Sequence, residues 1–256
     1  MFRQFFLVSS CFLGLNYAAD FEKTAICGGL LEKPELDVQT PIESKTAKKG
    51  STVVLECEFY AVPQASITWF HRGKAIQSHK AANLESFLTT NQIGISIILS
   101  KYRIDCLDES TSGEYFCQAT TPCKGTVVSS ALVTIDRSLE SEPSQSCKSR
   151  RNGSAPIPST PIITLFTMTR MELLGGVVQL SCRTEGYPQP EVTWNRLEED
   201  ESLTPIDLSL PEVMQLQNGD LLLVGDETII ADSFRCTAQN ELGAVYADSE
   251  VIYMNK

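Results

Sequence analysis

The sequence has 256 residues and carries 21 Lys and Arg against 32 Asp and Glu, a formal net charge of −11 at pH 7. With 42% hydrophobic residues it has the composition of a folded globular protein, and its length fits one large domain or two of ordinary size. Nucleic acid, heparan sulfate and anionic lipid are unfavourable partners for such a chain, because all three are polyanions.

The N-terminus has the pattern of a secretory signal peptide. One basic residue, Arg3, precedes an apolar run over residues 5–15, and the small residues Ala18 and Ala19 follow it. The run is too short to span a bilayer, so we expect cleavage after residue 19, with an uncleaved signal anchor as the alternative. The rest of the chain has no apolar run of about 18 residues and ends in the polar VIYMNK. The mature product is therefore expected to be secreted, extracellular and without membrane insertion.

Eight cysteines remain once Cys11 leaves with the signal peptide. An even number in an oxidising compartment favours disulfides over metal binding or catalysis. Their wide spacings also differ from those of zinc sites, so we expect no metal and no cofactor. The eight are Cys27, Cys57, Cys106, Cys117, Cys123, Cys147, Cys182 and Cys236.

Two stretches of the chain repeat one pattern. Residues 53–59 and 178–182 alternate apolar with polar residues, which predicts a half-buried strand with a cysteine on its inner face. A turn with the letters VPQA or YPQP follows, and then a second alternating segment that ends on Trp69 or Trp194, twelve positions after the cysteine in both halves. Another cysteine comes late in each half, within EYFCQA and SFRCTAQN. This order of strand, turn, tryptophan strand and late cysteine is typical of an immunoglobulin sandwich.

The repeat therefore resembles two tandem immunoglobulin-like domains of an all-β fold class, over residues 35–137 and 160–256. Residues 20–34 are expected to form an N-terminal arm, and residues 138–159 a short linker. The segments NGDLLL and CTAQNELG resemble the intermediate, or I-set, type of domain. In each domain the resemblance implies a disulfide between the two sheets with an indole packed on it, Cys57–Cys117 with Trp69 and Cys182–Cys236 with Trp194.

The tyrosine corner of this fold is matched in domain 1 and altered in domain 2. Gly113, Tyr115 and Cys117 match the G-x-Y-x-C motif, although Thr111 stands where the motif usually has Asp. The corresponding residue of domain 2 is Phe234, which has no hydroxyl for the corner hydrogen bond. The residues expected in the two cores are Trp69, Trp194, Tyr115 and Phe234.

The other four cysteines, Cys27, Cys106, Cys123 and Cys147, allow three pairings. In the sandwich topology the chain enters at the end that holds Cys123, whereas Cys106 and Cys147 lie at the opposite end. Cys106 and Cys123 should be roughly 20 Å or more apart at about 3.3 Å per residue, beyond the roughly 7 Å between Cα atoms that a disulfide allows. We therefore predict Cys27–Cys123 and Cys106–Cys147, which tie the arm and the linker to domain 1. An intermolecular disulfide is the alternative.

The linker, SLESEPSQSCKSRRNGSAPIPS, is rich in Ser and Pro and is expected to be extended and mobile. It contains Asn152-Gly-Ser, an acceptor sequence for N-glycosylation. Its basic run over residues 148–151 fits either a solvated turn or a cleavage site for a processing protease.

Charge is distributed unequally between the two domains. Residues 35–137 carry 10 basic and 11 acidic residues, whereas residues 161–256 carry 5 basic and 16 acidic residues. Two charged hairpins are candidate partner contacts, and for both a solvated turn is the alternative. A weak Ca²⁺ site is a further alternative for the acidic hairpin, which lacks EF-hand spacing. The basic hairpin contains His71, Arg72 and Lys74, and the acidic one contains Glu198, Glu199, Asp200 and Glu201.

The sequence has no pattern typical of an active site. The two histidines, His71 and His79, lie in or near a polar hairpin, and there is no Gly-rich phosphate loop, HExxH or G-x-S-x-G motif. Every mature cysteine has a partner in the disulfide scheme, so no free thiolate is expected. We therefore expect a protein that is not an enzyme.

A signal peptide, two immunoglobulin domains, a short linker and no anchor together resemble the secreted zwei-Ig proteins of nematodes. The extra cysteines and the segments NGDLLL and CTAQNELG add to this resemblance. It implies an extracellular recognition protein of the nervous system, with neuronal cell-surface receptors, adhesion molecules or matrix proteins as partners. The implied roles are cell adhesion, axon guidance and keeping axons and neurons in position. Homophilic pairing stays open, although the charge of domain 2 opposes pairing of that domain with itself.

Two other classes of function fit the same layout. One is a secreted trap for an insulin-like peptide hormone, which should present an exposed apolar patch across a sheet or between the domains. The other is a structural matrix component. An adhesion ligand more often uses a polar interface with a few aromatic anchors. Five aromatic residues are not placed by the alternation and are expected mostly in the core, namely Tyr60, Phe70, Phe87, Tyr187 and Tyr246.

Overall fold

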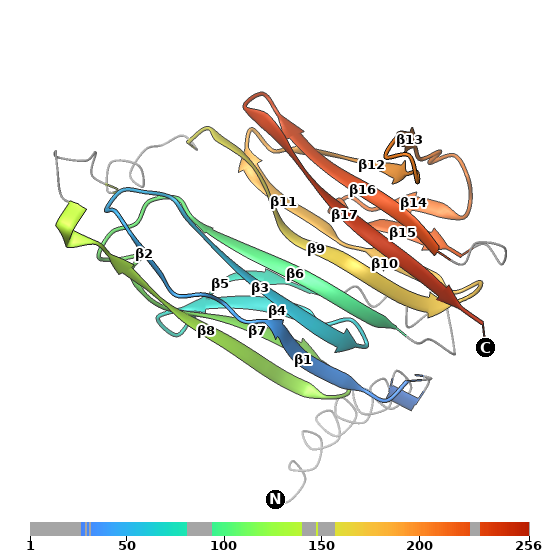
Figure 1. Ribbon diagram of the computed structural model, residues 1–256, viewed down its shortest axis with the longest axis horizontal. Helices are drawn as coiled ribbons and strands as arrows, with labels where there is room; N and C mark the ends of the chain where they lie inside the picture. The colour runs from blue at the N-terminus through green and yellow to red at the C-terminus, as the bar shows by residue number, and fades with distance from the viewer. Residues whose placement is uncertain are drawn as a thin grey trace, which may run out of the picture.

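The computed structural model describes residues 27–28, 30, 32–80, 94–139, 147, 157–225 and 231–255. The predicted all-β fold is confirmed, and the strands form two sandwiches that lie side by side (Figure 1). The predicted signal peptide, Phe87, the sequon at Asn152 and most of the linker lie outside the described residues. In the part of the chain that the structure describes, no helix has the length and apolarity needed to cross a membrane.

The first sandwich, called domain 1 here, is built from strands in which inward and outward residues alternate. In the strand over residues 53–62, for example, every second residue from Val53 to Phe59 is buried. The elements are β1 (Glu35–Thr40), β2 (Lys45–Ala47), β3 (Val53–Val62), β4 (Ser66–His71), β5 (Lys74–His79), β6 (Ile95–Ile104), β7 (Gly113–Thr121), β8 (Gly125–Ile135) and the short 3-10 helix η1 (Arg137–Leu139).

The second sandwich, called domain 2 here, begins with the longest strand of the described chain. Its strands are β9 (Ser159–Leu173), β10 (Val177–Leu180), β11 (Cys182–Tyr187), β12 (Glu191–Leu197), β13 (Leu203–Pro205), β14 (Val213–Gln215), β15 (Leu221–Val224), β16 (Ala231–Asn240) and β17 (Gly243–Met254).

The described strands form three sheets, and one of them runs through both domains. Domain 1 has a sheet of its own with the order β2-β8-β7-β4-β5, and domain 2 has one with the order β10-β15-β14. The remaining strands form a single sheet with the order β1-β3-β6-β9-β17-β16-β12-β13, in which β11 also pairs with β9. The second sheet of each sandwich is therefore part of one continuous ladder of backbone hydrogen bonds.

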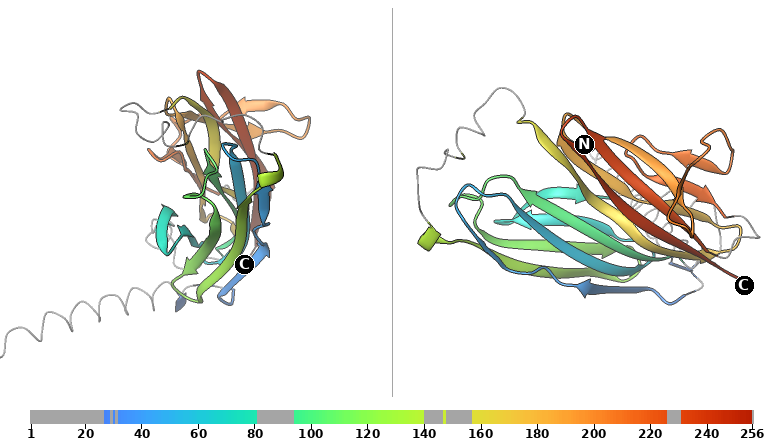
Figure 2. Two further views of the ribbon diagram at one scale, coloured as in Figure 1. Left: turned by 90° about the vertical axis from the view of Figure 1, so that its left-hand side faces the viewer. Right: turned by 45° about the horizontal axis from the view of Figure 1, so that its top comes forward.

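Strand β9 is the element that joins the two domains. One of its edges pairs antiparallel with β6, from Leu165 opposite Ser100 to Met171 opposite Ile95. Its other edge pairs with two strands of domain 2, with β11 along its first half and with β17 along its second half. Figure 2 shows β9 in yellow between β6 and β17. The placement of the domains is thus fixed by main-chain pairing as well as by the connecting chain.

Strand β9 also supplies side chains to both hydrophobic cores. Leu165 is 3% exposed and packs in the core of domain 1, around Trp69. Ile163 and Phe166 pack instead with the core of domain 2, around Trp194. A strand that is buried on both faces is expected to be apolar on both, and β9 meets that condition over this segment. The core of domain 1 is therefore completed by a side chain from domain 2.

The buried tryptophans of the two domains donate to different partners. Trp69 Nε1 donates to Ser100 Oγ at 2.9 Å, and that hydroxyl donates to the Thr164 carbonyl of β9 at 3.1 Å. Trp194 Nε1 donates to the Gly219 carbonyl at 2.8 Å, within domain 2. Both indole N–H groups are satisfied, as buried donors must be, but only Trp69 is linked to the neighbouring domain.

The corner residues are also buried and differ in their polar contacts. Tyr115 is 1% exposed, and its hydroxyl donates to the Thr111 carbonyl at 2.6 Å. Phe234 is 6% exposed and has no hydroxyl to place there. In domain 2 the carboxylate of Asp232 accepts two hydrogen bonds from the Arg196 guanidinium, the one from Nε at 2.7 Å. A bidentate ion pair therefore lies beside the corner position that lacks a hydroxyl.

Four disulfides are present among the described residues. One joins the two sheets of domain 1, one joins β11 to β16 in domain 2, and the other two hold segments outside the sandwich of domain 1 against it. They are Cys57–Cys117, Cys182–Cys236, Cys27–Cys123 and Cys106–Cys147, with Cα separations of 6.6, 6.5, 5.5 and 5.8 Å.

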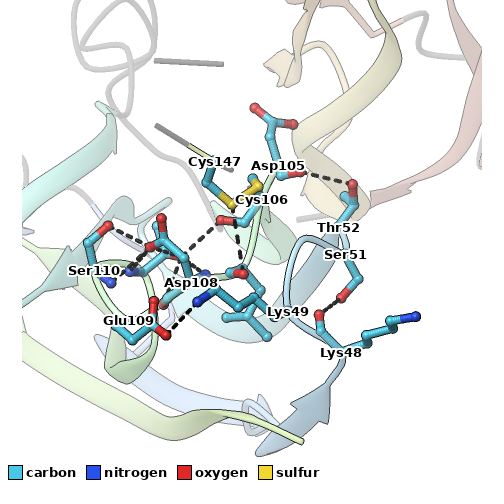
Figure 3. Close-up of a disulfide and its surroundings, with 12 residues drawn as sticks. Lys48, Lys49, Ser51, Thr52, Asp105, Cys106, Asp108, Glu109, Ser110 and Cys147 are labelled. Carbon is cyan, nitrogen blue, oxygen red and sulfur yellow. Dashed lines mark hydrogen bonds and ion pairs between the residues drawn. A yellow bond between two sulfur atoms is a disulfide. The ribbon is translucent and has the colours of Figure 1, made fainter. Parts of the chain in front are cut away.

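The Cys106–Cys147 disulfide lies in the loop between β6 and β7 (Figure 3). In the same region the Lys49 ammonium pairs with the Glu109 carboxylate at 2.7 Å, and Thr52 Oγ1 donates to the Asp105 carbonyl at 3.2 Å. These contacts join the loop to the turn before β3, so residue 147 is attached to a braced end of domain 1.

Candidate functional site

The basic hairpin between β4 and β5 has two of its three charged or polar side chains turned onto domain 1. The Arg72 guanidinium donates to the Glu109 carbonyl at 2.6 Å, and the His71 ring stacks on Tyr115 with ring centroids 4.2 Å apart. The third, Lys74, is exposed. His71 and Arg72 therefore brace the hairpin against the loop between β6 and β7, while Arg72 and Lys74 are both exposed to solvent.

The acidic hairpin lies between β12 and β13 and is open to solvent. Glu199, Asp200 and Glu201 are exposed, and Glu198 is half-buried. Hydrogen bonds from Ser202 lower the pKa of Asp200, so this carboxylate closes the turn. Within the described ranges, no group of three or more His, Cys, Asp or Glu side chains is arranged to hold a metal ion.

The structure does not bring the two hairpins together. The basic hairpin packs on the loop that follows β6, at the end of the molecule where Arg103 of β6 donates to the Thr160 carbonyl near the start of β9. The acidic hairpin follows the end of β12, which pairs with the start of β16. The start of β16 pairs in turn with the end of β17, at the opposite end of the strands. Two hairpins at opposite ends of the molecule form separate surfaces.

A polar contact between the domains involves β5 of domain 1 and β11 of domain 2. Gln77 Nε2 donates to Glu185 Oε1 at 2.8 Å, and the His79 ring lies near the ion pair of Arg183 and Asp220. Burial and the positive charge of Arg183 lower the pKa of His79 to about 4, although Asp220 acts in the opposite direction. The imidazole of His79 is therefore neutral at physiological pH.

The Arg183–Asp220 pair is itself part of the buried structure of domain 2. The Arg183 guanidinium donates to both oxygens of Asp220 at 2.7 Å, and the same carboxylate accepts from Gln179 Nε2 at 2.7 Å. The side chain of Asp220 is fully buried. Such a carboxylate is retained in a core only when its hydrogen bonds are satisfied, so this group supports the joint rather than a binding site.

The outer face of the β17-β16-β12 sheet carries an exposed aromatic residue held by charged neighbours. Tyr246 of β17 is 64% exposed, and the Arg235 guanidinium lies 4.2 Å from the centre of its ring. Arg235 in turn donates to both oxygens of Asp248, at 2.7 and 2.8 Å. We call these three residues the Tyr246 cluster. A cation–π contact and a bidentate ion pair fix the ring on rigid strands, in contact with solvent.

The expectation that most of the unplaced aromatic residues lie in the core was wrong, because two of them are exposed and two others, Tyr60 and Phe70, are only half-buried. Tyr246 is 64% exposed, and Tyr187, at the end of β11, is 43% exposed. The period of β17 could have placed Tyr246, because Ala247 and Val251 face the core and Asp248 shares the outer parity with Tyr246.

Comparisons with known proteins agree with the immunoglobulin fold described above. The family model of the immunoglobulin domain matches residues 33–121. The zwei Ig domain protein zig-3 of Caenorhabditis elegans is 31% identical over 217 residues, which cover 84% of this chain and 79% of that protein. Zwei Ig domain protein zig-4 of the same organism is 29% identical, over 84% of this chain and 78% of that protein.

A solved structure also matches both domains together. The crystal structure of the neural ectodermal development factor IMP-L2 superposes with a TM-score of 0.64 at 22% identity, and the match covers 90% of this chain and 98% of that one. At this identity the likeness shows a shared fold.

Proposed function

The chain belongs to the zwei Ig domain family of immunoglobulin proteins, and from this premise we propose that it is a secreted recognition protein of the nervous system. It is an immunoglobulin-domain binding protein, and its partners in this proposal are neuronal surface or matrix proteins. The role is cell adhesion, axon guidance or the maintenance of axon and neuron position. Four disulfides among the described residues fit an oxidising, extracellular location.

The Tyr246 cluster is the observation that supports this proposal most directly. Tyrosine and arginine are enriched among the residues that dominate the binding energy of protein interfaces. Here the ring is preordered by Arg235 and Asp248, so little side-chain entropy is lost when a partner covers it. The cluster combines one aromatic anchor with a polar surround, which is the interface expected of an adhesion ligand.

Charge adds a condition on the partner. Residues 161–256 carry 16 acidic and 5 basic residues, so domain 2 attracts a basic surface and repels an acidic one. Long-range attraction of this kind mainly raises the association rate and is screened as salt increases. We therefore expect a partner with a basic patch opposite the outer face of β16 and β17.

A binding screen tests the proposal. The full mature chain, made in a secretory host, is presented to an array of immobilised ectodomains of neuronal surface and matrix proteins and to insulin-like peptides. For a saturable hit among the ectodomains, Tyr246→Ala should weaken binding by roughly tenfold or more, as for an interface anchor. The control Leu208→Ala changes a residue of domain 2 that is 51% exposed and should alter the affinity less than about twofold.

The same screen separates the alternative functions. A saturable insulin-like peptide with no ectodomain hit favours the secreted hormone trap and contradicts the adhesion role. An ectodomain hit whose affinity is unchanged in Tyr246→Ala removes the Tyr246 cluster from the proposal and leaves the adhesion role in place.

A further inference from the structure

A second surface, on the opposite domain, has a different chemistry. It is the outer face of the sheet of β8, β7 and β4, which we call the open face of domain 1. Phe70 of β4 lies directly opposite Phe116 of β7, and both rings are half-buried. Val128 and Leu132 of β8 flank them and are 50% and 47% exposed. Four large apolar side chains on three neighbouring strands therefore form one solvent-exposed patch.

The surround of this patch is polar but almost without charge. Small hydroxyl and amide side chains occupy the other outward positions of these strands, where Glu114, opposite Leu132, is the one formally charged residue, and the exposed Arg72 follows directly after β4. The outward residues around the patch are Thr68, Glu114, Gln118, Thr120, Thr126, Ser130 and Thr134.

Lack of charge distinguishes this face from the other two large outer sheet faces of the molecule. The outer face of β1 and β3 carries Asp37, Glu56 and Glu58. The outer face of β16 and β17 carries Arg235 and Asp248. Since the whole chain has a net charge of −11, a sheet face with one acidic residue is a specific exception.

We propose that the open face of domain 1 is the surface through which two copies of this chain pair about a two-fold axis. In such a pairing the same patch lies on both sides, so each residue near the axis meets its own copy. A charged residue there would face an identical charge at close range, which opposes association. An apolar centre with a Ser and Thr surround can meet itself without that cost and can still exchange hydrogen bonds at its rim.

Charge on the rest of the molecule favours the same orientation. Residues 35–137 carry 10 basic and 11 acidic residues, whereas residues 161–256 carry 5 basic and 16 acidic. A dimer joined through domain 1 brings the nearly neutral domains together and leaves the two acidic domains apart. A different protein steered by charge would bind the acidic domain instead.

The inference goes beyond the proposed recognition of neuronal proteins, because it concerns how many binding surfaces one particle carries. Domains joined by a continuous sheet hold the open face and the Tyr246 cluster in a fixed relation. A dimer therefore presents two copies of the Tyr246 cluster, and binding to a surface with several receptors gains from effective concentration.

Sedimentation velocity on the full mature chain tests the proposal. Between about 1 and 200 µM, a range that brackets weak self-association through a small interface, the weight-average mass should rise towards that of a dimer. Val128→Glu should raise the dissociation constant by at least about tenfold, because two unpaired carboxylates would be buried against each other. Leu208→Glu, which adds the same charge at an exposed site of domain 2, should leave it within about twofold.

Mixing of opposite charges then tests the two-fold geometry. Val128→Glu and Val128→Lys should each be monomeric alone and should form a dimer when combined in equal amounts, because the charges then face each other as opposites. A thermal melt of each variant confirms that it is folded. If both variants fail to fold, Ser130→Cys replaces them, and it should form a disulfide-linked dimer faster than the control Leu208→Cys.

Three results would overturn the proposal. They are a chain that stays monomeric over the whole concentration range, a dimer that Val128→Glu does not weaken, and an open face that an insulin-like peptide occupies in place of a second copy. None of these changes the prediction for the Tyr246 cluster, so the two proposals can fail separately.

Discussion

The two domains repeat the same spacing of cysteine and tryptophan but complete the same part of the sandwich differently. In domain 2, the strand before the corner, β15, pairs with β10 on one side and with β14 of the same domain on the other. The corresponding strand of domain 1, β6, pairs with β3 on one side and with β9 of domain 2 on the other. Among the described residues, both edges of β15 are thus paired within domain 2, whereas one edge of β6 is paired by a strand of domain 2.

The polar contacts of the two cores differ in the same direction. The hydrogen bond of Trp194 ends on Gly219 within domain 2, whereas that of Trp69 continues through Ser100 to Thr164 of β9. The disulfide and tryptophan pattern that the two domains share therefore predicts the sandwich fold, but it does not predict whether a domain is stable without its neighbour. We infer that domain 1 depends on domain 2 for its stability more than domain 2 depends on domain 1.

The largest expected effect comes from two leucine-sized side chains of β9 that point into different cores. Leu165→Ala should destabilise domain 1, and Ile163→Ala should destabilise domain 2, each by about 2–5 kcal/mol because a buried aliphatic side chain is lost. Hydrogen exchange followed by mass spectrometry locates the destabilised domain in each variant. If Leu165→Ala accelerates exchange only in domain 2, the assignment of this side chain to the core of domain 1 is wrong.

A smaller effect is expected from the hydroxyl that links Trp69 to β9. Ser100→Ala leaves the buried indole N–H without its acceptor and should lower the free energy of unfolding by about 1–3 kcal/mol. Chemical denaturation followed by tryptophan fluorescence measures this change. Ser130→Ala, at an exposed outward position of domain 1, is the control and should change it by less than about 0.5 kcal/mol. Equal losses in the two variants would contradict a special role for the Ser100 link.

The smallest effect concerns pH at the joint. The pKa of His79 in the folded protein is about 4, below the value near 6.5 of an unfolded chain. As the pH falls, the unfolded state therefore binds a proton at His79 before the folded state does. The contribution of the neutral His79 to the free energy of unfolding is complete above about pH 6.5 and is lost as the pH falls towards 4. Because the ring is partly exposed, we expect a loss of about 1–2 kcal/mol over this window, less than the full shift implies.

The variant His79→Gln isolates this contribution from the other titrating groups. The free energy of unfolding, measured at pH 7 and pH 4.5 in both proteins, should fall less in His79→Gln than in the wild type. A steeper fall in the variant would mean that the histidine is protonated at the joint and stabilises it, the reverse of the direction that Arg183 and burial produce.

Much of this architecture could be read from the sequence because local patterns encode it. Alternation around Cys57 predicts the inner face of β3, and the late cysteines complete both core disulfides. Around Cys182 the prediction of one half-buried strand was wrong, because residues 177–182 are all buried and are divided between β10 and β11. The direction of the strands also places Cys106 and Cys147 at one end of domain 1, where the structure has their disulfide. Each of these inferences needs the strand period, the order of the strands or both.

The joint between the domains could be predicted only in part. Apolar residues of both parities, with Leu165 and Phe166 adjacent, indicate that β9 is buried on both faces. The sequence does not say which strand covers the second face, because pairing of β6 with β9 depends on the two surfaces meeting in space. Tyr246 was missed for a different reason, since its place on the outer parity of β17 was readable from the alternation.

Strand β9 has a consequence for the modularity of the molecule. A domain with its own hydrophobic core can in principle be moved from one protein to another and fold there on its own. A transplant of domain 1 alone would lose Leu165 from its core and would leave β6 with an unpaired edge, which is a template for aggregation. The smallest transplantable unit that keeps both cores closed is the pair of domains with its connecting chain.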